Sequence, residues 1–586
     1  MIELLKRFSG PYMRYFVLGP LCKLIEVFFD LLTPLVIARM IDWGVIAGDA
    51  RSVFISGVAL IVMAVVGIAF TLVCQKMAAL CSQGIGTEIR GALYAHVNEL
   101  SSAELDRFGT PSLITRITND VNQVQVAVAL GVRQLIRWPL LAVGSMIAAL
   151  LIDVRLGLVF LVSTPLIGVI FWVVMARCVP YFSNMQKALD RIALVCREGL
   201  SGVRVVRAFV REDHERKRFR EATEAQASIA TAVGSLSSIL NPATFLIMNV
   251  AVCVILVLGG QSVNVGGLTQ GQVMAFVNYM TQTLLSIVYV ANLVVVFTRA
   301  SASAARINEV FATEPSVRDV ADQAWEKPVC SADVPALAFD HVTFSYGSGA
   351  PALSDVTLAL YPGMTLGVIG GTGSGKSTLV SLISRLYDPS AGVVSVMGED
   401  VRSWPLSSLR HEVALVPQRA SLVAGTIRSN LLWRDSGASD DELWEALEVA
   451  QATDFVKAMP QGLDSAVEAG GKNFSGGQRQ RLTIARALVG SPSILVMDDS
   501  ASALDMRTDA ALRHAIRELG KCDAAAGKTP LTTVIVSQRV SAVRSADVIC
   551  VLDHGALAGL GTHEQLLETC GLYREICDSQ LKGEAN

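Results

Sequence analysis

The sequence predicts an all-helical membrane domain in the first half of the chain and an α/β domain of the P-loop type in the second half. Of the 586 residues, 52% are hydrophobic and only 17% are charged, whereas soluble chains carry about 25% charged residues. The hydrophobic excess lies within residues 1–312, and residues 313–335 form a proline-containing linker. In residues 336–586, apolar runs alternate with helical patterns, which is typical of a sheet covered by helices.

The first half contains six apolar segments long enough to cross a bilayer as helices. They are predicted at Tyr15–Ile41, Val53–Ala78, Val126–Ile152, Leu156–Val179, Leu236–Leu258 and Val273–Val296. Three connections are short, but residues 79–125 and 180–235 are long, helical in composition and basic. Because basic loops stay in the cytoplasm, we expect a multi-pass protein of the plasma or inner membrane with both termini cytoplasmic. The lipid bilayer is therefore one of its expected partners.

Charged residues interrupt two of these segments. Lys23, Glu26 and Asp30 share one face of the first span, because they are spaced at i, i+3 and i+7. They either line a translocation cavity or hold neighbouring helices together. Arg133 and Arg137, near the start of the third span, are expected close to the lipid headgroups.

A glycine-rich loop in the second half matches the phosphate-loop pattern G-x-x-x-x-G-K-[ST]. An apolar strand at residues 364–369 precedes the loop and a helical run at residues 376–386 follows it. Glycines let backbone N–H groups surround phosphates at a helix N-terminus. The residues expected to bind ATP here are Gly370, Gly371, Thr372, Gly373, Ser374, Gly375, Lys376, Ser377 and Thr378. Lys376 is expected to reach the β- and γ-phosphates, and Ser377 to ligate Mg²⁺.

Two further segments carry chemistry. The buried-strand run Ile494–Met497 leads into Asp498, which is placed to hold Mg²⁺, and into Asp499. Upstream of this strand, Ser-Gly-Gly-Gln at residues 475–478 opens a helical run. A serine hydroxyl and two glycine amides at a helix N-terminus form a second anion clamp.

The Ser-Gly-Gly-Gln motif ahead of the acidic strand resembles the signature of ATP-binding cassette (ABC) proteins. Six motifs stand in the family order over about 200 residues, which makes coincidence improbable. The resemblance implies roles for Tyr346 in stacking adenine, for Gln418 in the Q-loop and at Mg²⁺, and for Asp505 in the D-loop at residues 502–505. It also implies that a signature clamp closes on ATP held by another subunit; its residues are Ser475, Gly476, Gly477 and Gln478.

The long basic loops resemble the intracellular extensions of type IV ABC exporters. Residues 106–120 resemble the first coupling region of that family, and residues 203–209 resemble the second. The resemblance implies that these short helices press on the cassettes and convert their closure into movement of the membrane helices. Six spans are half of what such exporters need, so the chain resembles a half-transporter.

Two positions depart from the family pattern at the reaction centre. Asp499 stands where the family usually has Glu, so its carboxylate is one methylene short of the attacking water. A misplacement of about 1 Å can cost about 100-fold in rate. Gln538 stands at the switch position, where the family usually has His, and its amide cannot carry a proton or a positive charge.

The chain therefore resembles the degenerate-site subunit of heterodimeric, multidrug-type ABC exporters. We expect impaired hydrolysis at its own site and a functional signature clamp for the site of a partner, a second half-transporter of different sequence. Alternatives are a homodimer with slow but competent hydrolysis, an importer with an exporter fold, and a nucleotide-gated channel or regulator. The six spans exclude a soluble ABC ATPase that acts on DNA.

The cysteine content and the net charge limit which further sites and partners we expect. The eleven cysteines lack metal-like spacing and are expected to be reduced thiols, without a disulfide framework or a zinc site. The formal net charge of -3 indicates no nucleic-acid partner. The sequence does not distinguish a small molecule, a lipid or a peptide as the transported substrate.

Overall fold

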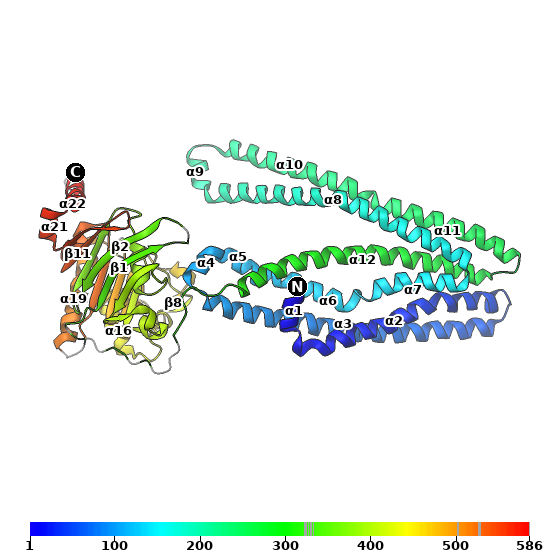
Figure 1. The fold of residues 1–586 in the computed structure, drawn as a ribbon, viewed down its shortest axis with the longest axis horizontal. Coiled ribbons are helices and arrows are strands. Elements are labelled where there is room, and N and C mark those ends of the chain that lie inside the picture. The colour runs from blue at the N-terminus through cyan, green and yellow to red at the C-terminus, as the bar shows by residue number, and fades with distance from the viewer. Residues whose placement is uncertain are drawn as a thin grey trace. The chain divides into compact units, whose positions relative to one another are not determined.

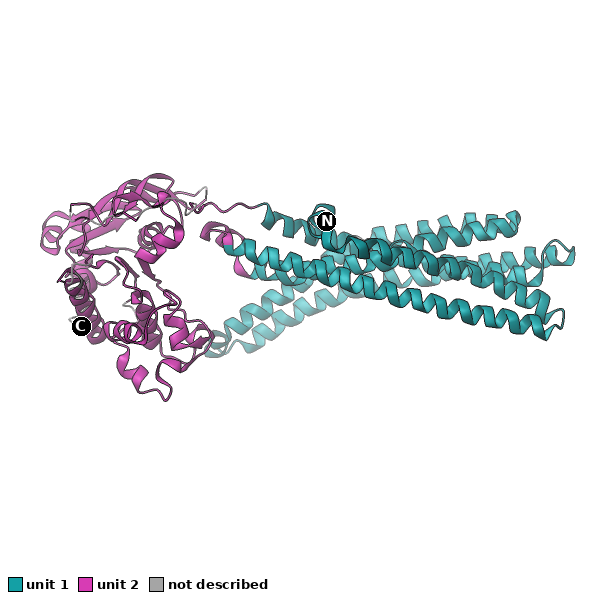
Figure 2. Cartoon of the chain, turned by 90° about the horizontal axis from the view of Figure 1, so that it is seen from below, with its two compact units in different colours: residues 1–98, 111–312 teal, residues 99–110, 313–586 magenta. Residues whose placement is uncertain are grey.

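The computed structural model describes residues 1–320, 325, 327–328, 331, 333–347, 349–500, 503–525 and 529–584. The chain forms two compact units, unit 1 with residues 1–98 and 111–312 and unit 2 with residues 99–110 and 313–586 (Figure 2). Residues 99–110 belong to unit 2 although they lie between two membrane segments in the sequence. Much of the predicted linker, together with Ser502 of the D-loop, falls outside the described residues.

Unit 1 is built from helices, several of which are long (Figure 1). They are α1 (Ile2–Phe8), α2 (Met13–Met40), α3 (Ala50–Glu99), α5 (Thr110–Thr115), α6 (Val121–Gln134), α7 (Arg137–Ile152), α8 (Val154–Ser201), α9 (Val203–Ala208), α10 (Glu212–Ser238), α11 (Leu240–Asn264) and α12 (Gln270–Phe311). Within the described residues, five helical segments are long and apolar enough to cross a membrane. The 28-residue helix α2 supplies the first predicted span, with charged residues at its centre. Together these elements form the predicted six-helix membrane domain.

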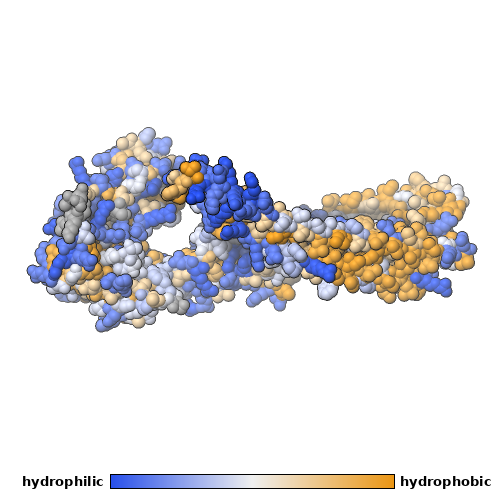
Figure 3. All heavy atoms as spheres, turned by 90° about the horizontal axis from the view of Figure 1, so that it is seen from above, coloured by the Kyte–Doolittle hydropathy of each residue, from blue (hydrophilic) through white to orange (hydrophobic). Residues whose placement is uncertain are grey.

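The surface of unit 1 is that of a membrane protein. Large apolar side chains point outward, including Ile61, Leu151 and Trp172, which are 65%, 82% and 71% exposed. Figure 3 shows hydrophobic residues covering one end of this helical unit, while hydrophilic residues gather toward the other end. Exposed apolar surface on this scale is stable only against lipid or a partner.

The charged residues of the first span form a partly buried network that joins three helices. Glu26 Oε2 accepts hydrogen bonds from Lys23 Nζ at 2.5 Å and from Thr71 Oγ1 at 2.6 Å. Arg137 lies 3.1 Å from both Glu26 Oε1 and Asp30 Oδ2. Arg137, which is expected close to the headgroups, thus has two carboxylate partners in α2 that the sequence does not indicate. The network supports a helix-holding role, although Glu26 and Asp30 also line a groove between α2 and α3.

Unit 2 contains two larger sheets and a set of helices. Its strands are β1 (Leu337–Ser345), β2 (Pro351–Leu360), β3 (Thr365–Gly370), β4 (Ala391–Val396), β5 (Glu399–Asp400), β6 (Val413–Val416), β7 (Gly425–Thr426), β8 (Ala466–Val467), β9 (Ile494–Asp498), β10 (Thr532–Val536), β11 (Val548–Asp553) and β12 (Ala556–Gly561). Its helices are α4 (Ser102–Phe108), α13 (Lys376–Ile383), α14 (Leu406–Glu412), α15 (Ile427–Leu431), α16 (Asp440–Val449), α17 (Thr453–Lys457), α18 (Gly476–Leu488), α19 (Met506–Ala525), α20 (Val540–Val543), α21 (His563–Thr569) and α22 (Gly571–Glu584).

The central sheet has the strand order β12-β11-β3-β10-β9-β6, and the pairs from β11 to β6 are parallel. All five residues of β9 and of β10 are buried, as expected for parallel strands covered on both faces. The second sheet, β2-β1-β4-β5, is antiparallel. This α/β architecture matches the fold class that the sequence predicts.

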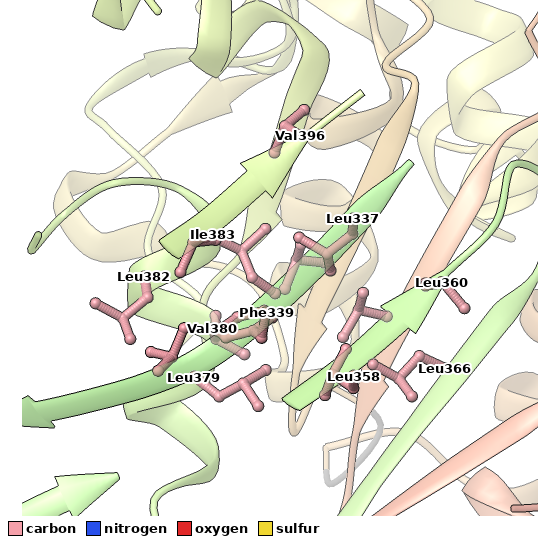
Figure 4. Close-up of a cluster of buried hydrophobic side chains, with 14 of the residues drawn as sticks. Leu337, Phe339, Leu358, Leu360, Leu366, Leu379, Val380, Leu382, Ile383 and Val396 are labelled. Atoms are coloured by element: carbon pink, nitrogen blue, oxygen red, sulfur yellow. The ribbon is translucent and has the colours of Figure 1, made fainter. Parts of the chain in front are cut away.

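Helix α13 is fixed to the two sheets by an apolar core (Figure 4). Leu379 and Ile383 of this helix are fully buried together with Phe339 of β1 and Leu366 of β3. Each such side chain contributes about 2 kcal/mol when it leaves water. The loop between β3 and α13 is therefore held at both ends by rigid elements.

Candidate functional site

Four parallel strands of unit 2 bring the predicted nucleotide motifs to one edge of the sheet. The phosphate loop follows β3, Gln418 follows β6, Asp499 follows β9 and Gln538 follows β10. These strands are consecutive in the order β3-β10-β9-β6. Because carboxyl ends of parallel strands meet at one edge, these residues surround a common site, the usual ligand position in open α/β sheets.

The glycines of the phosphate loop make room that a side chain would fill. A Cβ on Gly370 would lie 2.2 Å from the Leu552 carbonyl oxygen. Gly375 has a φ of +97°, and a Cβ there would lie 2.5 Å from the Ala352 carbonyl oxygen. The loop thus needs glycine for its path, and it ends directly at the N-terminus of α13. Backbone N–H groups at such a terminus fit the phosphates of ATP.

Lys376 lies within this loop. Its Nζ donates to the carbonyl oxygens of Gly370 at 3.0 Å and of Gly371 at 2.6 Å. Burial lowers the pKa of Lys376, and the carboxylates of Asp499 and Asp498 oppose this shift. The ammonium group therefore faces both the loop and the acidic pair, as a phosphate-binding lysine must.

Asp498 ends β9 and is 9% exposed. Burial raises the pKa of Asp498, a hydrogen bond from Ser377 lowers it, and the neighbouring Asp499 raises it. A carboxylate, a hydroxyl and, from Gln418, an amide oxygen are ligands of the kind that Mg²⁺ takes. The residues present thus fit this ion beside the phosphate loop.

Asp499 has an unusual backbone conformation. Its φ is 44°, in the left-handed region that Asp adopts more readily than most residues. Its N–H donates to the Val536 carbonyl oxygen at 3.0 Å, which ties it to the end of β10. Gln418 Nε2 approaches Asp499 Oδ2 at 3.5 Å. The Q-loop and the shortened acidic side chain are therefore brought together.

Gln538 is exposed and is held through its backbone by the last helix. Its carbonyl oxygen accepts a hydrogen bond from Gln580 Nε2 at 2.7 Å. The Val540 N–H donates to Gln580 Oε1 at 2.8 Å. The sequence gives no signal for Gln580, because its role depends on how α22 packs.

Tyr346 is 47% exposed, which leaves ring surface for a base. Its hydroxyl lies 3.2 Å from Thr378 Oγ1, so the ring is tied to α13 beside the phosphate loop. Its ring centroid lies 5.3 Å from that of Tyr387, at an interplanar angle of 86°. Tyr387 was not predicted from the sequence, because its position beside Tyr346 is a tertiary contact.

The signature residues cap helix α18. Ser475 Oγ accepts a hydrogen bond from the Gln478 N–H at 3.3 Å, and Gln478 Oε1 accepts one from the Ser475 N–H at 2.9 Å. Ser475 and Gly476 are exposed, whereas Phe474 is buried and anchors the motif in the core. Because both hydrogen bonds join residues at the start of α18, they leave the N-terminus of this helix exposed.

The D-loop lies next to this clamp. A Cβ on Gly477 would lie 3.3 Å from the Ala503 carbonyl oxygen. Asp505 Oδ2 accepts a hydrogen bond from the Thr508 N–H at 3.1 Å and thereby caps the start of α19. The described part of the D-loop is therefore packed against the signature.

The replacement Lys376→Ala is expected to weaken ATP retention by about 10-fold to 100-fold, the value of hydrogen bonds to a charged group. Filter binding of labelled ATP to the purified chain measures this. Lys521→Ala is the matched control, because Lys521 is an exposed lysine paired with Glu518. Unchanged retention in Lys376→Ala would remove the phosphate loop from its assigned role.

A helical membrane domain followed by a nucleotide-binding domain with these motifs defines an ATP-driven transporter of the ABC class. Residues 16–288 match the model of the ABC transporter transmembrane region, and residues 353–502 match the ABC transporter model. The chain belongs to the ABC transporter family and has the architecture of its exporters.

Relatives and a solved structure agree with this assignment. The chain is 36% identical, over 99% of its length and 98% of the relative, to an uncharacterized ABC transporter ATP-binding protein of Mycobacterium tuberculosis. It is 31% identical to a probable multidrug resistance ABC transporter ATP-binding/permease protein of Bacillus subtilis, over 84% of this chain and 82% of that protein. Its fold resembles the structure of a bacterial Atm1-family ABC exporter with ATP bound, with a TM-score of 0.76, 24% identity and 98% of each chain covered.

Proposed function

We propose that this chain is the degenerate-site half of a heterodimeric ABC exporter. The proposal depends on one observation: both residues that would drive hydrolysis, at the ends of neighbouring strands β9 and β10, depart from the family pattern. Asp499 has the shorter carboxylate and Gln538 the amide that does not ionise. The signature clamp at Ser475 and Gly476, by contrast, is intact and exposed.

Bound ATP with Mg²⁺ supplies a γ-phosphate whose cleavage powers transport. The phosphate loop and Lys376 hold the phosphates, while Ser377, Asp498 and Gln418 hold the metal. Asp499 orients water poorly at this site, so the site retains nucleotide and keeps the two cassettes in contact. Ser475 and the amides of α18 complete the partner's site, where turnover resets the cycle.

The same proposal places the protein in the plasma or inner membrane with both termini in the cytoplasm. The basic composition of the two long loops supports this orientation. Coupling to the membrane helices is assigned to residues 106–120 and 203–209, which lie within those loops and include the end of α4 and the whole of α9. The cargo is a small molecule, a lipid or a peptide, and a Mycobacterium bovis relative, 31% identical over 82% of this chain, is described as a fatty acid ABC transporter.

The test compares ATPase activity of the purified full-length chain with that of the chain co-expressed with a second half-transporter. We expect little ATP turnover by the chain alone, because its Asp499 carboxylate is misplaced. Turnover in the pair should be about 100-fold higher, which is what a misplacement of about 1 Å can cost. The double replacement Asp499→Glu with Gln538→His is the matched gain-of-function variant and should raise turnover of the chain alone. Brisk turnover by the unaltered chain would favour the rival, a homodimer with competent hydrolysis.

A further inference from the structure

A hydrogen bond in unit 2 joins the aromatic residues of the nucleotide site to helix α4. The Tyr387 hydroxyl donates to Asp106 Oδ2 at 2.6 Å, across 281 positions of sequence. Burial and the hydrogen bond to Asp106 raise the pKa of Tyr387, so the hydroxyl keeps its proton at neutral pH. Figure 2 shows the short segment that contains α4 in the colour of the cassette unit. The bond therefore lies inside one compact body.

Three aromatic rings fix one another beside this bond. The Tyr387 ring lies edge-on to Tyr346, and its centroid is 5.5 Å from that of Phe344. The Phe344 and Tyr346 centroids are 4.9 Å apart, at an interplanar angle of 87°. Edge-to-face pairs of this kind have a preferred geometry that contributes beyond simple burial. A base that stacks on Tyr346 thus restrains Tyr387 as well.

Helix α4 is also held at its N-terminal end. The Ser101 hydroxyl accepts a hydrogen bond from the Val317 N–H at 2.9 Å, and Ser316 Oγ donates to Glu104 Oε2 at 3.4 Å. Ser316 and Val317 follow α12 in the chain, on the way to β1. Since α3 ends at Glu99 and α5 begins at Thr110, α4 is joined through the chain to a helix of unit 1 on either side. Tyr387 links α4 to Tyr346 beside the phosphate loop.

We propose that Tyr387 is a positioning residue that couples occupancy of the adenine platform, Tyr346, to the position of α4 through Asp106. The proposal rests on the proposed function, because it requires the base of ATP on Tyr346. The coupling runs from the base end of the nucleotide. It is separate from Gln418 and Asp499, which lie at the phosphate end.

Hydrogen–deuterium exchange of residues 102–108 tests this in the full-length chain in lipid nanodiscs. Mg²⁺-ATP is expected to slow exchange in α4 by about tenfold, the equilibrium equivalent of one hydrogen bond to a charged group. Inorganic tripolyphosphate, which occupies the phosphate loop without a base, is expected to leave exchange unchanged. Equal protection by tripolyphosphate would overturn the coupling from the base.

Variants separate the hydroxyl from the ring. Tyr387→Phe keeps the ring cluster, so ATP affinity should stay within about twofold, while the ATP-dependent protection of α4 is lost. Tyr361→Phe is the matched control, because Tyr361 is an exposed tyrosine of the same unit and should retain the protection. Protection retained in Tyr387→Phe would refute the proposal.

The two proposals fail in distinguishable ways. Tight ATP binding by the unaltered chain, with no change of exchange in α4, would refute the coupling alone. Absence of ATP binding would refute the proposed function and the coupling together. In a pair with a partner, Tyr387→Phe should lower substrate-stimulated ATPase more than basal ATPase, a split that a merely structural role would not produce.

Discussion

Replacing Gly476 by leucine is expected to lower ATP turnover of the assembled transporter by at least about 100-fold, the value of one oxyanion-type donor. Gly476 opens helix α18, and a Cβ there would meet nothing within 4 Å in its own chain. The leucine therefore fits the isolated subunit and obstructs only what approaches the helix N-terminus from outside. ATPase activity of the co-purified pair measures the effect, and Ser475→Ala should act in the same direction.

Gly571→Leu is the matched control for this experiment. Gly571 is also an exposed glycine that opens a helix, α22, and a Cβ there would likewise meet nothing within 4 Å. It should leave turnover unchanged. Asp499→Asn should cost less than Gly476→Leu, because on the proposed function the site that contains Asp499 contributes little hydrolysis. If Asp499→Asn proved the more damaging change, the two sites would have been assigned the wrong way round.

Replacing Glu26 by glutamine is expected to destabilise the membrane domain by about 3 kcal/mol, the cost of breaking a buried ion pair. Glu26 is 7% exposed and Lys23 is 3% exposed, so the loss leaves a cation without its counter-charge in the interior. Arg137 would lose the same partner. The change is measured by heating the purified protein to a series of temperatures and determining the remaining folded fraction by size-exclusion chromatography.

Asp30→Asn is the milder comparison for the same network. The Asp30 side chain is 34% exposed and pairs with Arg137 through one oxygen, so its loss should cost less than that of Glu26. Unchanged stability of Glu26→Gln, combined with an altered substrate dependence of ATPase activity, would favour the cavity interpretation over the helix-holding one.

The sequence predicts the phosphate loop and its flanking elements because their determinants are local. The apolar run before Gly370 and the periodic run after Lys376 each dictate one element, β3 and α13, and glycine dictates the turn between them. The same holds for Ser475, since a capping box needs only residues three positions apart. Local chemistry thus defined most of the candidate site.

Other residues could not be found in this way. Tyr387 belongs to no predicted motif, and although Asp106 begins the predicted first coupling region, nothing in the sequence pairs these two distant residues. The position of Arg137 near the start of a span suggests only a headgroup position, whereas its partners, Glu26 and Asp30, lie in another helix. In each case a contact between distant segments overrides the local pattern, and one sequence alone does not report such contacts.

Helix α22 has a wider consequence for how this protein can vary. The side-chain amide of Gln580 hydrogen-bonds to the backbone of Gln538 and of Val540, on both sides of Arg539. On the proposed function, we expect a replacement of Gln580 to change how long ATP stays bound, although every nucleotide motif stays intact. Evolution could then change the rate of the transport cycle through α22, without any change in the residues that contact ATP.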